Sequence, residues 1–261
     1  MNAITEAEYR AIPALSGTGV AELLRSPADY HYKLSHPSEP SPAMALGTLT
    51  HALILGQEPS AVVSPYPDFR TKEAREWRDS QVLDVVTADV WAAAEAMAEA
   101  VHAHPVAAGL LGQMGEPEVV VTGEHRGAAL KGRIDYLPAS GPVIDIKTAR
   151  DHTAPAMSGA LGEYGIATQL AHYALLAGRD EDRPLVIAVR NTGRPAVAVY
   201  RIGEVTWAVA LAATRRAWDL YAECIESGVW PDPYATGVHD LEMKSWALDE
   251  LDPLSAEIEV K

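Results

Sequence analysis

The chain of 261 residues carries 21 lysines and arginines against 36 aspartates and glutamates, which gives a net charge of −15. Its composition, 48% hydrophobic and 22% charged, is typical of a packed globular protein and excludes an intrinsically disordered one. The single cysteine, Cys224, excludes a disulfide framework, a cysteine-ligated zinc and an iron–sulfur cluster. No apolar run approaches the roughly 18–20 residues of a membrane span, and the first ten residues lack a signal-peptide pattern. We therefore expect a soluble, cytoplasmic protein.

The acidic balance argues against a nucleic-acid partner, because phosphate binding usually accompanies an excess of basic residues. It does not exclude one, since an enzyme can gather its few cations along one cleft and remain acidic elsewhere.

Helices dominate the predicted N-terminal part. Residues 16–34 predict two short helices, because Ser16 suits an N-cap and Ser26-Pro27 ends one helix and begins the next. Residues 60–70 contain two prolines and no clear periodicity, which predicts a loop. Further helices are expected at 44–56, at 71–81 and at 87–103, the last ending before Pro105.

From Glu116 the pattern changes to short β-branched stretches separated by turn residues. We expect an antiparallel meander of three strands (118–122, 129–137, 143–148), a helix (160–177), two more strands (185–191, 196–202) and a long helix (204–227). The predicted fold is thus α/β, a single domain over residues 1–261. It comprises an N-terminal helical part (1–115), a small mixed central sheet flanked by helices (116–228) and a mostly irregular tail (229–261).

Two carboxylates and a lysine are predicted to share one face of the sheet. Because side chains alternate along a strand, Asp145 and Lys147 face the same side while Ile144 and Ile146 point into a core. Pairing through the preceding turn brings Asp135 within reach of Asp145. Such charges in an apolar frame cost several kcal/mol each unless compensated, and a divalent cation would compensate them. The alternative is an exposed hairpin face with an ion pair worth under about 1 kcal/mol.

Two further features favour the functional interpretation. Glu118 lies on the preceding predicted strand, and Gln169 and Tyr173 are spaced to share one face of the next helix. By themselves, Gln169 and Tyr173 would describe only a surface amide beside a half-buried tyrosine.

The ordered motifs resemble the PD-(D/E)XK nuclease superfamily, more narrowly its RecB-like branch and the exonuclease VIII (RecE-type) enzymes of phages and prophages. The resemblance rests on Gly132-Arg133-Ile134-Asp135, then Asp145-Ile146-Lys147-Thr148, then Gln169 followed by Tyr173. It extends from about residue 15 to about residue 250, through Gly47-Thr48-Leu49-Thr50-His51 and the tail Val229-Trp230-Pro231. A Walker-type phosphate loop is missing, which separates the chain from helicase–nuclease fusions.

The resemblance implies a role for each matching residue. Asp135 and Asp145 would bind the catalytic metal, with His51 and the Ile146 carbonyl as further ligands. Lys147 would be the catalytic lysine, Glu118 an additional acidic residue of the site, and Gln169 and Tyr173 would shape the site and contact DNA. For His51 the alternative is a satisfied core histidine on an apolar helix.

The implied activity is a Mg²⁺-dependent exodeoxyribonuclease, with Mn²⁺ able to substitute. It would degrade double-stranded DNA ends, 5′ to 3′, to leave single strands for phage-type recombination. The resemblance also implies a ring-shaped homo-oligomer, a single-strand annealing protein as partner, and no membrane association. Local cations would hold the DNA, although most of them also fit a solvated helix face; they are Arg70, Lys72, Arg75, Arg78, Lys131 and Arg133.

Two alternatives from other classes remain open. One is a catalytically silent protein of the same fold that binds DNA ends; retention of costly charges at positions 51, 135, 145 and 147 argues against it. The other is a metal-dependent enzyme acting on a small molecule, for which the acidic surface is the only support.

Overall fold

The computed structural model describes residues 6–36 and 41–243. Its centre is a six-stranded mixed sheet, whose strands are β1 (Leu15–Ser16), β4 (Gly115–His125), β5 (Ala128–Pro138), β6 (Ile144–Ala149), β7 (Leu185–Arg190) and β8 (Val197–Arg201). β4, β5 and β6 form the predicted antiparallel meander, β7 pairs parallel with β6, and β8 pairs antiparallel with β7. The prediction of an α/β fold with a mixed sheet is confirmed.

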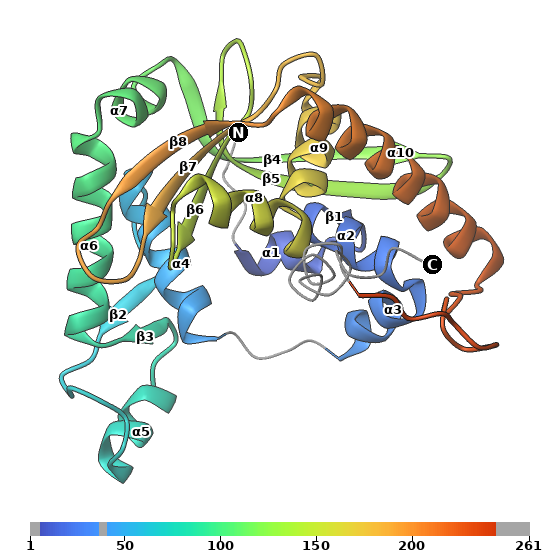
Figure 1. The fold of residues 1–261 in the computed structure, drawn as a ribbon. Helices are drawn as coiled ribbons and strands as arrows, with labels where there is room; N and C mark the ends of the chain where they lie inside the picture. The colour runs from blue at the N-terminus through green and yellow to red at the C-terminus, as the bar shows by residue number, and fades with distance from the viewer. Residues whose placement is uncertain (1–5, 37–40, 244–261) are drawn as a thin grey trace, which may run out of the picture.

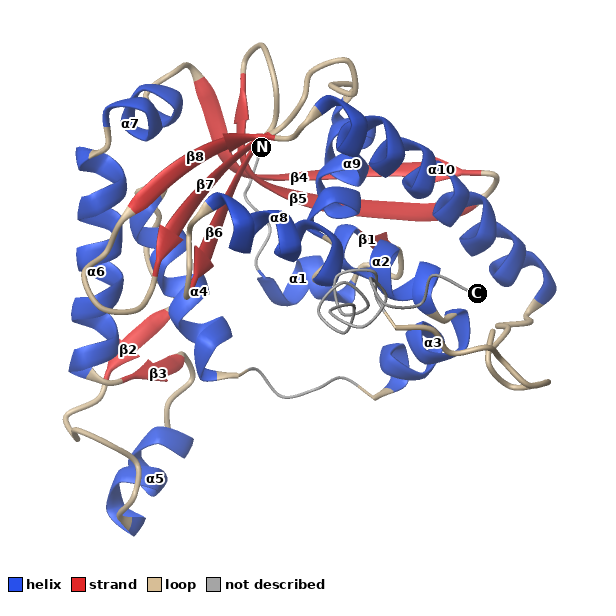
Figure 2. Cartoon of the chain, in the orientation of Figure 1, coloured by secondary structure: helices blue, strands red, loops and turns tan. Residues whose placement is uncertain are grey.

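The sheet forks at β5. β4 pairs along the whole of β5, so the other edge of β5 is shared by β1, at Leu130 and Lys131, and by β6, at Tyr136. Figure 2 shows the β4–β5 ribbon diverging from the β6–β8 strands beyond this point. Side chains from both arms can therefore meet where the arms separate.

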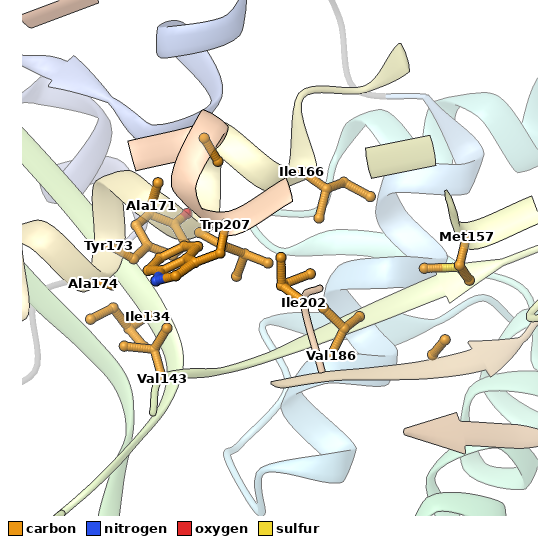
Figure 3. Close-up of a cluster of buried hydrophobic side chains, with 13 residues drawn as sticks. Ile134, Val143, Met157, Ile166, Ala171, Tyr173, Ala174, Val186, Ile202 and Trp207 are labelled. Atoms are coloured by element: carbon orange, nitrogen blue, oxygen red, sulfur yellow. The ribbon is translucent and has the colours of Figure 1, made fainter. Parts of the chain in front are cut away.

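Helices cover both faces of the β6–β8 arm (Figure 1). On one face lie α4 (Pro42–Ile54), α6 (Ala88–Ala103) and α7 (Pro105–Leu111); on the other lie α8 (Ala154–Glu163), α9 (Ile166–Ala177) and α10 (Glu204–Ser227). Alternate residues of β7 enter opposite cores, Ile187 on the α6 side and Val186 and Ala188 on the α9 side. The core on the α9 side also holds Tyr173 and Trp207 (Figure 3). Two covered faces explain the continuous apolar run of β7.

Predicted helix starts are confirmed at three caps. Ser16 accepts a hydrogen bond from the Gly19 amide at the start of α2 (Gly17–Arg25), at 3.3 Å. Ser26 accepts one from the Asp29 amide at the start of α3 (Pro27–Ser35), at 3.1 Å. Thr87 caps α6 in the same way, at 3.4 Å from the Val90 amide. Each side chain satisfies an amide that the helix leaves unpaired.

Several elements differ from the sequence prediction, which also lacks β1. The helix predicted at 160–177 is two helices, because Gly165 adopts a left-handed conformation (φ 67°) between α8 and α9. The loop predicted at 60–70 contains β2 (Ala61–Val63), which pairs with the unpredicted β3 (Asp84–Val86). α1 (Glu6–Ala11) and α7 are also additional, while α5 (Lys72–Asp79) confirms the helix predicted there.

The described tail is irregular, as predicted, and begins by packing on α3. The Pro231 carbonyl accepts a hydrogen bond from the Ala28 amide at 3.2 Å, and the Trp230 ring stacks on His31. Residues 244–261 of the predicted tail lie outside the described residues. None of the helices described is long and apolar enough to cross a membrane.

Candidate active site

The fork of the sheet gathers the predicted site residues from five elements. Asp135 comes from β5, Asp145 and Lys147 from β6, Glu118 from β4, His51 from α4, and Gln169 and Tyr173 from α9. They form two neighbouring sets, one of Asp145, Lys147, Gln169 and Tyr173 and the other of His51, Asp135 and Glu118.

Buried Asp145 and half-buried Lys147 form the ion pair at the centre. The ammonium of Lys147 lies 2.9 Å from Oδ1 of Asp145 and 2.8 Å from Oδ2, and the contact with Oδ1 is a hydrogen bond. Oδ2 is buried without a hydrogen-bond partner among the described residues. Ile144 and Ile146 point away from the site, into the core on the α6 side of the sheet, as the alternation predicts. The Lys147 ammonium thus lies close to both oxygens of Asp145 and is hydrogen-bonded to Oδ1.

Gln169 connects the lysine to the helix behind it. Its Oε1 accepts a hydrogen bond from the Lys147 ammonium at 3.1 Å, and its Nε2 donates to the Tyr173 hydroxyl at 2.9 Å. Tyr173 is only 7% exposed. Its ring thus lies beneath the site and its hydroxyl orients Gln169, while contact of Tyr173 with DNA stays a prediction.

Two glycines make room for the Tyr173 ring. A Cβ on Gly17 would come within 2.7 Å of Tyr173 Cε1, and a Cβ on Gly132 within 2.9 Å of Cδ1. The glycine of the Gly132-Arg133-Ile134-Asp135 motif thus permits close packing of α9 on β5.

Asp135 and His51 form a second pair beside the first. Oδ2 of Asp135 accepts a hydrogen bond from the Ile146 amide at 2.7 Å and lies 3.6 Å from Nδ1 of His51. The amide of Ile146 therefore fixes Asp135. A metal contact of the Ile146 carbonyl stays a prediction.

Glu118 enters the site through a strained backbone. Its φ is +51°, a conformation that costs a residue other than glycine about 1–2 kcal/mol. Its neighbours Pro117 and Val119 pair with Tyr136 and Ile134, which places Glu118 opposite Asp135. One oxygen of Glu118 lies 2.9 Å from Nε of Arg133. The motif spacing predicted the position of Glu118 but contained no signal of this strain.

The electrostatics of the site are set by burial and by mutual charge. Burial raises the pKa of Asp145 to about 6, against the opposing effect of Lys147. Burial alone would lower the pKa of Lys147 and of His51, but Asp145 and Asp135 respectively outweigh it, and both pKa values are raised. Burial would likewise raise the pKa of Asp135, but His51 beside it keeps that pKa below its usual value. Mutual charge therefore shifts Lys147, His51 and Asp135 toward their charged forms, whereas burial disfavours the charged form of Asp145.

The donor set fits a divalent cation. One ligand atom each from His51, Glu118 and Asp135 lie within 4.8 Å of one another. Carboxylate oxygens are ordinary ligands of Mg²⁺ and Mn²⁺, whereas an imidazole nitrogen suits softer divalent cations better than Mg²⁺. The compact group differs from the predicted ligand set by including Glu118, while Asp145 is engaged by Lys147. Which of the four binds metal stays a prediction.

The predicted DNA-binding cations lie in different settings. Lys131 is buried, and its ammonium donates to the carbonyls of Tyr9, Arg10 and Ile12 at 2.9, 3.2 and 2.7 Å. It holds the C-terminal end of α1 against β5, and its contact with DNA stays a prediction. Arg133 forms an ion pair with Glu118, and its Cζ lies 5.3 Å from the centre of the Tyr9 ring.

The other four predicted cations, Arg70, Lys72, Arg75 and Arg78, lie in or beside α5. Figure 1 shows α5 projecting beyond β2 and β3, away from the central sheet. Their position separates them from the fork.

Comparison with known proteins identifies the fold. The family model described as a PDDEXK-like domain of unknown function (DUF3799) matches residues 16–238. A candidate exonuclease from Eubacterium rectale is similar in structure, with a TM-score of 0.60 and 12% identity over 94% of this chain and 97% of that one. A phage-related exonuclease from Haemophilus somnus 129PT matches 83% of this chain and 96% of its own at 11% identity, with a TM-score of 0.37. No curated protein matches the sequence significantly.

Proposed function

Because the chain belongs to the PDDEXK-like domain family and the matched region spans the whole site, we propose that it is a metal-dependent nuclease that cleaves DNA. One observation carries the proposal: the fork brings the ion pair of buried Asp145 and half-buried Lys147 together with the His51, Glu118 and Asp135 group. Several charged side chains packed this closely are costly to bury, and a bound ligand would offset that cost.

The residues would divide the chemistry among them. His51, Asp135 and Glu118 would hold the cation, with Asp145 as the fourth candidate ligand. When bound, the metal would supply Lewis-acid stabilisation of charge on the phosphate. Lys147 would orient the attacking water, and Gln169 would fix the position of the ammonium through its 3.1 Å hydrogen bond. Tyr173 would hold Gln169 in place.

We further propose the narrower activity that the motifs imply. The enzyme would use Mg²⁺ or Mn²⁺, degrade linear double-stranded DNA from its ends in the 5′ to 3′ direction, and leave single strands for recombination. A homo-oligomeric assembly, an annealing protein as partner and a cytoplasmic location belong to the same proposal. The names of the two structurally similar exonucleases are consistent with it.

Digestion of linear and closed-circular duplex DNA, in Mg²⁺ and in EDTA, tests the proposal. We expect loss of linear DNA only, only with metal, and at least 100-fold slower loss with Asp145→Asn or Lys147→Met. The matched control is Asp89→Asn, which changes an exposed aspartate on α6. Survival of linear DNA in both Mg²⁺ and Mn²⁺ would contradict the nuclease proposal and leave a silent end-binding protein to be tested.

A further inference from the structure

Arginines gather at one end of the β6–β8 arm, three residues beyond the catalytic lysine. β6 ends at Ala149, which pairs with Arg190 at the end of β7. Arg150 follows β6, and Arg194 lies in the turn between β7 and β8. At the strand rise of 3.3 Å per residue, Arg150 lies roughly 10 Å from Lys147, the length of about three nucleotides of a B-form strand.

Hydrogen bonds to backbone carbonyls connect the segments at this end of the sheet. The Thr192 hydroxyl donates to the Arg150 carbonyl at 2.9 Å, and the Asn191 amide donates to the Ala149 carbonyl at 2.9 Å. Arg190 donates from Nε and Nη2 to the Arg194 carbonyl, at 3.0 and 2.6 Å, which fixes the turn. Arg190 thus supports the position of Arg194 as well as adding charge.

The guanidinium groups of Arg150 and Arg194 are exposed, and within the described part of the chain neither makes a hydrogen bond or an ion pair. The neighbouring helix α4 contains no acidic residue, and its Gly47 faces Thr148 Oγ1 of β6. Asp151 is the only carboxylate in the segments 147–153 and 189–195. This end of the sheet is therefore locally basic in a chain whose net charge is −15.

The cations of α5 provide the contrast. Arg70 lies 3.6 Å from Asp68, Lys72 lies 3.5 Å from Glu76, and Arg78 lies 2.8 Å from Asp79. Arg75 donates to the carbonyl of Arg70 at 2.7 Å. The positive charge of α5 is therefore largely compensated by its own acidic neighbours.

We propose that Arg150 and Arg194 bind the phosphate backbone of the substrate DNA next to the cleavage site, with Arg190 positioning the turn. The inference rests on the proposed nuclease function. It assigns the DNA grip to the carboxyl ends of β6 and β7 in place of α5. Such contacts carry no sequence preference and depend strongly on salt, because each one releases a bound counterion.

Fluorescence anisotropy of an end-labelled linear duplex in EDTA tests the inference without cleavage. The double variant Arg150→Gln/Arg194→Gln is compared with Lys72→Gln/Arg75→Gln on α5, which removes the same charge. For the first variant we expect at least tenfold weaker binding at 50 mM NaCl and a slope of log affinity against log salt that is smaller by about 1 per arginine. The α5 variant should bind within twofold of the wild type.

Three results would overturn the inference: unchanged affinity and slope in the Arg150/Arg194 variant, an equal or larger loss in the α5 variant, or no binding of the wild type at 50 mM NaCl. Unchanged thermal unfolding of both variants excludes a folding defect, since all four side chains are exposed. Failure of the nuclease proposal has a separate signature, because the wild type would then bind the duplex yet leave it intact in Mg²⁺ and Mn²⁺.

Discussion

His172 shows how a single buried side chain makes stability depend on pH. The residue is 0% exposed, and its Nδ1 lies 2.9 Å from Nε1 of Trp218. Because an indole nitrogen only donates, Nδ1 accepts, and the proton on Nε2 is donated to the Lys131 carbonyl at 2.9 Å. Burial lowers the pKa of His172 to about 4, so the ring stays neutral in the folded protein.

We therefore expect stability to fall between about pH 6.5 and pH 4. In that window the unfolded chain binds a proton at His172 and the folded chain does not. Above pH 6.5 His172 is neutral in both the folded and the unfolded chain and costs no stability. By pH 4 protonation of the unfolded chain lowers the free energy of unfolding by as much as about 3 kcal/mol. Urea unfolding at pH 7.5 and pH 4.5 should show a smaller drop for His172→Gln than for the wild type, while exposed His239→Gln should keep the full drop. Equal drops for all three proteins would contradict the assignment.

Glu118 offers a second test at this scale, because its backbone strain can be relieved. Glu118→Gly removes about 1–2 kcal/mol of strain and adds about 1 kcal/mol of unfolded-state entropy, so we expect the free energy of unfolding to change by less than about 1 kcal/mol. Mn²⁺ affinity by calorimetry should fall at least tenfold. Arg126→Gly is the matched control, since Arg126 also has a φ of +51° but lies in the β4–β5 turn. Unchanged Mn²⁺ affinity for Glu118→Gly would remove Glu118 from the metal site.

At the scale of elements, the break between α8 and α9 depends on Gly165. A Cβ there would lie 2.2 Å from Cβ of Ala21 on α2, and the φ of +67° disfavours any other residue. We expect Gly165→Ala to destabilise the protein by 3 kcal/mol or more, from strain and overpacking together. Gly178→Ala, at φ +64° with no atom within 4 Å of the added Cβ, should cost only about 1 kcal/mol. Equal losses in thermal unfolding would show that the contact with Ala21 does not matter.

The sequence could predict the elements that depend on local contacts, and it missed those that depend on residues far away in the chain. Helix starts at Ser16, Ser26 and Thr87 were predictable because each cap is a contact over three residues. The Asp145–Lys147 pair was predictable because alternation along a strand is local. The end of α8 at Gly165 depends on Ala21, far away in sequence, and β2 exists only by pairing with β3. The burial of Lys131 likewise depends on residues 9–12, which no local pattern connects to it.

At the scale of the molecule, the proposed metal site joins α4 to the β4–β5 ribbon. His51 comes from the helix that covers the β6–β8 arm, whereas Glu118 and Asp135 come from β4 and β5. A ligand that binds only the folded protein stabilises it by mass action, by about 2.7 kcal/mol at a hundred times its dissociation constant. For a chain of this size that corresponds to a rise in Tm of roughly 5–10 °C.

We therefore expect saturating Mn²⁺ to raise Tm by several degrees, and Asp135→Asn to abolish the rise. A chain with a net charge of −15 also attracts cations non-specifically, so the comparison is made at constant ionic strength in 150 mM NaCl, where exposed charges are screened within about 8 Å. Exposed Asp89→Asn should retain the full shift, because it changes the same type of side chain outside the fork. An equal shift in Asp135→Asn would show that the cation stabilises the acidic surface as a whole, and that the fork holds no specific metal.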